Sequence, residues 1–372
     1  MRTHRKRILV VAIALFLMGA LAACGDDDAE TTATSDATTT SQGSNGEEPG
    51  PDYANDVMKW HMSTVFPHAP SGQIEQVLLR TNLAELWGLD LETTRFASAV
   101  EMVNALAADS IDSFMASDLP VTSAIGKGLE LNIIGSSVGW RFGIATKNDS
   151  GIEELADLRG KKLGLHIGNS TQRYLQDALE QAGLTPNEDV EIVNVPTPEM
   201  NTALQSGVVD AVGTWDPGLR LLTDAKELFS GQTGAGLPNP ASVIAVRTST
   251  VTDDREAAVR FMAATIEAIW FAIENPDLTN GWFAEESGLP VEIMEAMLET
   301  EPLWQARAIS DIDMRVSDEA IEGLTKNVAY FFEQGMAPKA IDAGEHVDNS
   351  IVEEAMERIA EIGPREVEVL DP

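Results

Sequence analysis

Cysteine is almost absent from this sequence: Cys24 is the only one in 372 residues, which excludes a framework of intrachain disulfides. Basic residues are also few, 25 against 60 acidic ones, and the formal charge of −35 repels nucleic acids and anionic lipid surfaces. The one long apolar run, Ile8–Ala23, has 16 residues and falls short of the roughly 20 that a membrane-spanning helix needs. Phosphate-loop, HExxH and clustered Cys/His motifs are lacking too, so we predict neither a metal nor a cofactor.

The N-terminus has the pattern of a secretory signal. Four bases precede the apolar run, and small residues end it at "LAAC", residues 21–24. This string resembles a bacterial lipobox, in which the cysteine receives the lipid and becomes the first residue after cleavage. An ordinary signal peptide with an incidental cysteine is the alternative. We predict a signal peptide over 1–23, lipid attachment at Cys24, and a location outside the cytoplasm, anchored to a bacterial membrane.

A polar segment follows the cysteine. Residues 25–52 contain eight acids, no base and no large apolar side chain, so they cannot bury enough surface to offset chain entropy. As a flexible coil such a segment reaches about 30 Å. We therefore predict a disordered acidic tether over 24–52, followed by about 320 residues, enough for two lobes that each have a core.

The remaining sequence alternates short β-like runs with helical patterns, which favours an α/β architecture. The predicted strands are 56–63, 89–96, 111–116, 130–136, 142–147, one that ends near His166, 189–195, 209–214 and 241–249. After the last strand the chain is predicted to be almost entirely helical, over 253–275, 277–286, 290–299, 317–334 and 349–361, with Gly335 as a helix stop.

Five segments in order carry a resemblance to a known family. They are "SAVEMVNALAADSIDSFMASDLP", "SGIEELADLRGKKLGL", "GNSTQRYLQDALEQAGL", "VEIVNVPTPEMNTALQSGVVDAVGTWDPG" and "HVDNSIVEEAME". Together they resemble the ABC-transporter solute-binding proteins of the nitrate, sulfonate, taurine and thiamine-precursor type. The resemblance covers the chain from about Asp56 to Ile362.

The resemblance implies a type II periplasmic-binding-protein fold, in which two α/β lobes joined by two crossovers hold a ligand between them. Lobe I would comprise 53–141 plus 248–372 and lobe II 142–247, with crossovers near 139–142 and 247–250. The implied function is capture of a small solute, as a monomer, for an ABC permease and its ATPase. A sensor module that reports ligand state to a receptor is an alternative.

Ligands of open α/β sheets bind beyond the carboxyl ends of strands, so the strand-to-helix loops supply the predicted contacts. "GNST" follows a strand and opens a helix, where free N–H groups attract anions. Trp215 is either a cavity wall or a packing residue. The predicted ligand-binding residues are Phe66, His68, Ser98, Ser117, Asp118, Trp140, Arg141, Asn169, Ser170, Thr171, Trp215 and Asp216.

Several of these residues have a second interpretation. Asp118 and Asp216 read as helix N-caps, Asp216 with a proline at the first helical position, or as partners of a ligand amine. Ser98 is a predicted N-cap as well. His68 can be a solvated surface residue, and Asn169 or Ser170 a simple cap. Arg141 can bind a carboxylate or sulfonate with two hydrogen bonds, or pair with a nearby acid.

The ligand class stays open at this point. The helix start and Arg141 favour an anionic head such as a sulfonate, the aspartates suit a zwitterion such as taurine, and the aromatic residues suit a pyrimidine or aromatic precursor. Nitrate and bicarbonate fit less well, because several aromatic residues suggest more apolar surface than such ions use.

An enzyme on the same fold is a further alternative. Pyrimidine-precursor synthases and desulfinases of this fold rely on cysteines, and this chain has none after Cys24. "GSSVG" matches the G-x-S-x-G nucleophile string at Ser137, but a strand rather than a helix is predicted to follow it. The prediction is therefore a binding protein and not an enzyme.

Overall fold

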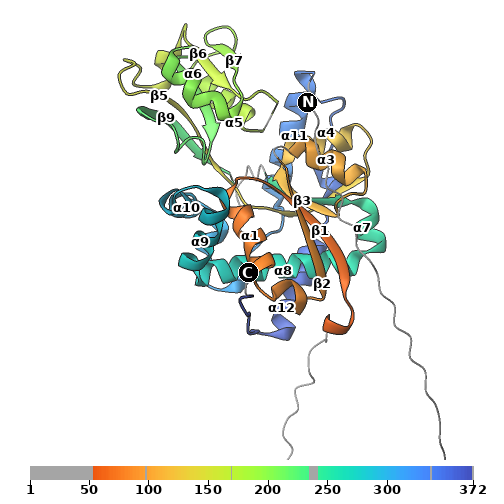
Figure 1. Ribbon diagram of the computed structural model, residues 1–372. Coiled ribbons are helices and arrows are strands. Elements are labelled where there is room, and N and C mark those ends of the chain that lie inside the picture. Colours follow the sequence, from red (N-terminus) through yellow and green to blue (C-terminus); the bar gives the residue numbers. More distant parts are fainter. Residues whose placement is uncertain (1–52, 97–98, 169, 234–241, 336, 371–372) are drawn as a thin grey trace, which may run out of the picture. The chain divides into compact units, whose positions relative to one another are not determined.

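The structure, a computed structural model, describes residues 53–96, 99–168, 170–233, 242–335 and 337–370. Cys24 and the predicted signal and tether lie outside the described residues. Two five-stranded mixed sheets organise the described chain (Figure 1). The first sheet has the order β2-β1-β3-β10-β4, from Leu89–Phe96, Met58–Val65, Ser113–Ser117, Ser242–Arg247 and Leu131–Ser136. The second has the order β7-β6-β8-β5-β9, from Glu191–Asn194, Lys162–Leu165, Ala211–Trp215, Arg141–Lys147 and Ala225–Gln232.

Each sheet contains one strand that arrives from the other sheet's part of the chain. β5 follows β4 directly and pairs antiparallel with β8 and β9, while β10 follows β9 and pairs antiparallel with β3 and β4. The return crossover therefore lies before Ser242, and its prediction near 247–250 is wrong. The sequence "ASVIAVRTS" reads as a strand equally well in either sheet, so its pattern could not decide between them.

The other predicted strands are found within a few residues of their predicted bounds, and one strand was missed. β9, with the sequence AKELFSGQ, has no alternation of buried and exposed positions because it is an edge strand paired only with β5. The predicted helix after Asp216 is also wrong, since the chain makes turns between β8 and β9.

Helices cover both sheets, and those of the second half match the predicted helical run. α11 begins after Ser317, whose side chain accepts a hydrogen bond from the Ala320 amide at 3.1 Å, and Gly335 after its end has a φ of +71°. The helices are α1 Ala69–Arg80, α2 Leu83–Leu86, α3 Ala99–Ala107, α4 Asp118–Gly126, α5 Ser170–Gln181, α6 Met200–Ser206, α7 Thr248–Asp253, α8 Arg255–Glu274, α9 Pro276–Ser287, α10 Val291–Leu298, α11 Asp318–Glu333 and α12 Ser350–Ile362.

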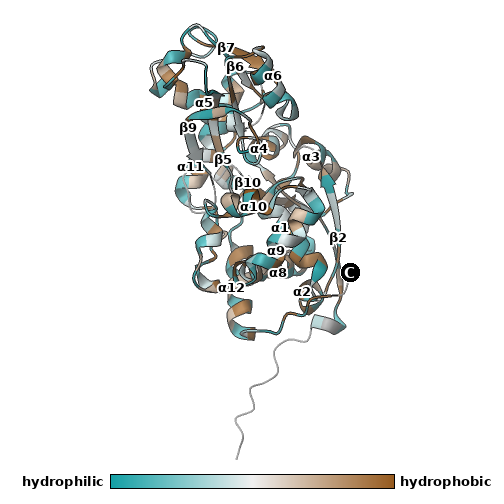
Figure 2. Cartoon of the chain, turned by 60° about the vertical axis from the view of Figure 1, so that its left-hand side comes forward, coloured by the Kyte–Doolittle hydropathy of each residue, from teal (hydrophilic) through white to brown (hydrophobic). Residues whose placement is uncertain are grey.

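Separate apolar clusters lie under the two sheets. α8 contributes a nearly continuous series of buried residues to the largest cluster, where Phe261 stacks on Trp60 with ring centroids 5.0 Å apart. The surface helix α12 carries both hydrophilic and hydrophobic residues (Figure 2), and Ile351, Val352 and Ala355 are on its buried side. Among the described residues, no helix is long and apolar enough to cross a membrane.

Gly213 in β8 provides a test of packing in the second sheet. A Cβ atom there would lie 2.4 Å from Leu165 Cδ2 and 2.6 Å from Leu175 Cδ1. Gly213→Ala is expected to lower the free energy of unfolding by roughly 1 kcal/mol, because both leucines must move. Gly281→Ala in α9 is the control, since a Cβ there meets nothing within 4 Å and alanine favours a helix. Urea unfolding measures both, and equal stabilities would contradict the packing described.

Candidate functional site

A cavity of about 250 Å³ lies where the carboxyl ends of strands from both sheets meet. Residues at or just after the carboxyl ends of β1, β3, β6 and β8 line it, as expected for an open α/β sheet. Its lining consists of Val65, Pro67, His68, Ser71, Ala99, Val100, Met115, Ala116, Ser117, Pro120, Trp140, His166, Ile167, Gly168, Ser170, Thr171, Trp215 and Ser242. None of the described lining residues is a lysine or an arginine.

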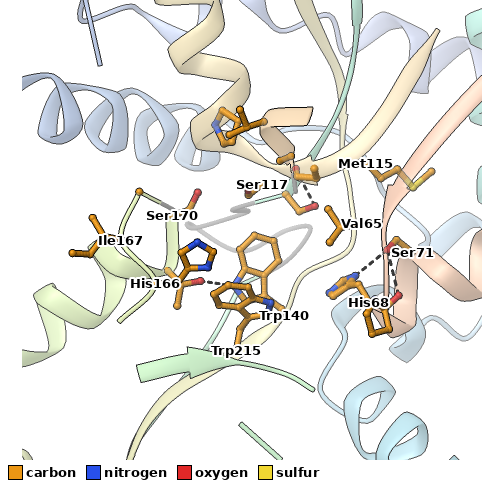
Figure 3. Close-up of a pocket in the computed structure, with 18 residues that line it drawn as sticks. Val65, His68, Ser71, Met115, Ser117, Trp140, His166, Ile167, Ser170 and Trp215 are labelled. Carbon is orange, nitrogen blue, oxygen red and sulfur yellow. Dashed lines mark hydrogen bonds between the residues drawn. The ribbon is translucent and has the colours of Figure 1, made fainter. Parts of the chain in front are cut away.

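Aromatic rings form much of the cavity wall (Figure 3). Trp215 ends β8 and stacks on His166, with ring centroids 6.1 Å apart and an interplanar angle of 23°. Trp140 precedes β5 and meets His68 edge to face, with centroids 6.3 Å apart. Both tryptophans are half-buried, so each has apolar area that a ligand can cover.

The start of α5 supplies polar groups to the cavity. Gly168, with a φ of +93°, turns the chain into the helix, and Ser170 and Thr171 are its first residues. The Gly168 amide donates to Gln172 Oε1 at 2.9 Å. Thr171 Oγ1 accepts a hydrogen bond from Trp140 Nε1 at 3.2 Å, which links the tryptophan wall to the helix. The predicted contact Asn169 lies outside the described residues.

His68 is a buried, neutral imidazole rather than a solvated surface residue. Its side chain is within hydrogen-bond distance of Ser71, with Nδ1 and Oγ 2.9 Å apart (Figure 3), and Nε2 is buried without a hydrogen-bond partner in the described structure. Burial lowers the pKa of His68 to about 4, and the nearby Gly139 backbone opposes only part of that shift. His68 therefore remains uncharged at neutral pH.

Arg141 and Asp216 each form ion pairs with charged residues close to them instead of facing the cavity. Arg141 pairs with Glu227, and its Nη1 lies 3.9 Å from Asp216 Oδ1. Asp216 is 1% exposed and accepts from Arg220 Nε at 2.8 Å. Arg220 Nη2 also donates to the carbonyl oxygen of Ala296 in α10, at 2.7 Å. Neither Arg141 nor Asp216 is a lining residue, and their ligand contacts stay predictions.

Asp118 lies behind the cavity lining and is 1% exposed. Asp118 is the first residue of α4, and Ser117 occupies the N-cap position. The prediction that Asp118 is the N-cap is therefore wrong by one residue. Its carboxylate accepts hydrogen bonds from the Ser170 hydroxyl and from Asn327 Nδ2, the latter at 3.2 Å. Burial raises the pKa of Asp118, and these two hydrogen bonds act in the opposite direction.

Phe66 packs away from the cavity lining, with its ring 5.6 Å from that of Phe283 and 4.6 Å from the Arg95 guanidinium. Ser98 lies outside the described residues. The structure thus brings six predicted residues around one cavity: His68, Ser117, Trp140, Ser170, Thr171 and Trp215. Ligand contact by these residues stays a prediction.

Sequence reasoning missed three polar lining residues. His166 directly follows β6, so the rule that sites lie at carboxyl ends would have found it. Ser71 lies in the first turn of α1, where only the neighbouring His68 drew notice. Ser242 was missed because β10 was placed in the wrong lobe.

A buried carboxylate fixes the crossover beside the cavity. Glu301 is 1% exposed and precedes a 3₁₀ turn, Pro302–Gln305. Its Oε2 accepts from the Gly139 amide at 2.8 Å, and its Oε1 accepts from the Leu303 amide at 3.4 Å. Burial raises the pKa of Glu301 to about 8 against the smaller effect of both hydrogen bonds. Because Gly139 precedes Trp140, Glu301 helps to position a cavity wall.

The sheet order, the two crossovers and a cavity between the sheets define the type II periplasmic-binding-protein fold, which confirms the predicted fold class. The NMT1/THI5-like family model matches residues 86–279, and the chain belongs to this family. A putative aliphatic sulfonates-binding protein of Bacillus subtilis is 29% identical over 276 residues, which are 73% of this chain and 80% of the relative.

Solved structures agree on the fold. The periplasmic aliphatic sulphonate binding protein SsuA from Escherichia coli matches with a TM-score of 0.65 and 20% identity, over 78% of this chain and 92% of that one. The desulfurization enzyme DSZB matches with a TM-score of 0.60 and 15% identity, over 81% and 99%. The fold therefore occurs both in binding proteins and in an enzyme.

Proposed function

We propose that this chain is the extracytoplasmic solute-binding component of an ABC importer and that it captures a small organic sulfonate between its two sheets. The observation that carries the proposal is the cavity at the carboxyl ends of four strands, lined by two tryptophans and by the start of α5. The named function of the Bacillus subtilis relative supports the sulfonate class. Delivery to a permease and its ATPase completes the proposed role.

Neutral donors would hold the sulfonate. The described lining has no lysine or arginine, but amides at a helix start and hydroxyl groups bind anions through hydrogen bonds and the helix dipole. Thr171 and Ser117 supply hydroxyls, and His68 supplies an uncharged imidazole. Trp140 and Trp215 would cover the apolar part of the ligand.

A pyrimidine or other aromatic ligand is the second candidate. It is favoured by the same two tryptophans together with the lack of a charged donor in the described lining, because a neutral ring needs apolar faces and no counter-ion.

An enzyme such as a desulfinase-like hydrolase has less support. The sequence has no cysteine after Cys24. Ser137 lies in the crossover between β4 and β5, so a strand follows it where a nucleophile elbow requires a helix. Within the described part of the chain, no group of three or more His, Cys, Asp or Glu residues is placed to hold a metal ion.

Ligand binding would draw the two sheets together, since the ligand contacts both and favours the state in which it makes more contacts. Lipid attachment at Cys24 and a monomeric state belong to the same proposal. Intact-mass measurement of the membrane-extracted protein tests the first, and light scattering with and without ligand tests the second.

The decisive experiment is calorimetry of the purified protein with an alkanesulfonate, taurine, an aromatic sulfonate and a substituted pyrimidine. A sulfonate is expected to bind and to raise the melting temperature, since 100-fold excess over Kd adds about 2.7 kcal/mol of stability. Binding of the pyrimidine alone would favour the second candidate. Measurable turnover of any compound would contradict a role in binding only.

A further inference from the structure

A second cavity, of about 360 Å³, lies beside the largest apolar cluster. It is formed by α8, by α12, by residues 309–310 and by the segment 363–367 that follows α12, and it shares no lining residue with the cavity between the sheets. Its volume is within the range of sites that hold small molecules. The two cavities can therefore bind different ligands.

Apolar side chains form most of the wall of this second cavity. They are Trp270 from α8, Ile309 from a 3₁₀ turn, Met356 and Ile359 from α12, and Val367 from the segment after α12. Trp270 is half-buried, so part of its ring surface is available to a ligand. Water in contact with such a wall is displaced favourably by an apolar group. The wall therefore fits a ligand with an apolar body.

The charged residues of the second cavity leave one negative charge unpaired. Arg365, the only base in the described lining, pairs with Glu267 of α8. Glu267 also accepts a hydrogen bond from Trp87 Nε1 at 2.6 Å. Glu274, the last residue of α8, is exposed, and its carboxylate has no hydrogen-bond or ion-pair partner in the part of the chain that the structure describes. Glu274 is therefore available to a positively charged group.

The two helices that line the second cavity lie side by side (Figure 1), run in the same direction and end beside it. Arg255 at the start of α8 pairs with Glu354 in the first half of α12, and Glu267 near the end of α8 pairs with Arg365 just after α12. No helix follows α12 within the described residues, and the last carbonyl groups of a helix carry negative partial charge. This end of α12 also favours a cation.

We propose that the second cavity is a binding site for an organic cation with an apolar body, such as an arylammonium or alkylammonium compound. Its positive charge would lie beside Glu274 and the end of α12, and its apolar body would cover the wall around Trp270, whose ring face also attracts cations. The site differs from the first cavity in position and in the charge of its ligand, so the inference does not rest on the proposed function.

Calorimetry of the full-length protein with benzyltrimethylammonium tests the inference, because this probe joins a permanent positive charge to an aromatic ring. Benzyl alcohol lacks the charge and tetramethylammonium lacks the ring, so each is expected to bind at least about tenfold more weakly. Trp270→Ala and Glu274→Gln are each expected to weaken binding of the probe about fivefold.

Two control variants identify where the probe binds. Glu292→Gln, which removes an exposed carboxylate on α10, is the charge-matched control and should keep the affinity. Trp215→Ala alters the first cavity and should keep it too. A loss of affinity in Trp215→Ala with none in Trp270→Ala would place the probe in the first cavity and overturn the inference.

Other outcomes would reject it as well. Absence of binding at millimolar benzyltrimethylammonium would reject the second site, and equal affinity for benzyl alcohol would reject the cationic class of ligand. An unchanged affinity in Glu274→Gln would reject the role of Glu274, and this exposed position decides the matter even where Trp270→Ala fails to fold. Sulfonate binding is measured separately, so its failure would reject the proposed function and leave this inference standing.

Discussion

Replacing Trp215 with alanine is expected to weaken ligand binding about 30-fold, equivalent to about 2 kcal/mol, because a half-buried ring that would cover apolar ligand surface is lost. The reason is specific to the position of Trp215, which ends β8 and is backed by the His166 ring. A ligand between the sheets would contact its free face. Trp215→Phe should recover part of the loss, since it keeps an aromatic face of smaller area. Calorimetry with the tightest sulfonate measures all three proteins.

Trp282→Ala is the matched control for this prediction. Trp282 in α9 stacks on Phe271 in α8, with ring centroids 6.4 Å apart, and it does not line the cavity. Its loss can lower stability but should change affinity less than threefold. Equal losses of affinity in Trp215→Ala and Trp282→Ala would mean that the cavity described is not where the ligand binds.

The free energy of unfolding of the unaltered protein is expected to decrease as the pH rises, and Glu301→Gln is expected to abolish this decrease. The pKa of Glu301 is about 8 in the folded protein, above its ordinary value of 4.5, so the folded state binds more protons than the unfolded state between these values. The free energy of unfolding therefore falls with rising pH across this window, by about 5 kcal/mol in all. Glutamine stays uncharged and abolishes this contribution.

Chemical unfolding at pH values between 6.5 and 8 measures the effect. Over this range the free energy of unfolding of the unaltered protein is expected to fall by about 1.5 kcal/mol more than that of Glu301→Gln. His68 acts in the opposite sense, since its pKa is lowered to about 4. Only about 0.4 kcal/mol of its contribution is gained above pH 6.5, and it is the same in both proteins, so it does not affect the comparison. Glu295→Gln is the control, because Glu295 is exposed on α10. Parallel curves for Glu301→Gln and the unaltered protein would contradict the buried carboxylate.

Local sequence patterns were sufficient to predict features that lie within a single helix or at its start. "GNST" combines a glycine with a helix start, and the structure places Ser170 and Thr171 in the cavity lining. The helix over 318–333 was equally clear, because its cap, its apolar spacing and its terminal glycine all agree. The fold class followed from the alternation of strands and helices together with the order of five motifs.

Pairings between distant segments could not be predicted from one sequence. Arg141 has the chemistry of an anion-binding residue, and only the fold brings Glu227 and Asp216 to it. Asp118 lies 209 residues before Asn327, and their hydrogen bond depends on how α4 packs against α11. Glu301 is one of 60 acids, and nothing in its local sequence distinguishes the one that is buried against a crossover amide.

The hydrogen bonds of Arg220 link the two halves of the protein. Arg220 neutralises Asp216 beside the second sheet, and it donates a hydrogen bond to the carbonyl oxygen of Ala296 in α10, a helix that packs with the first sheet's helices. Separating the two sheets would therefore break a hydrogen bond donated by a charged group, with or without a ligand. A measured association constant then includes the free energy of this bond wherever ligand binding changes the separation of the sheets.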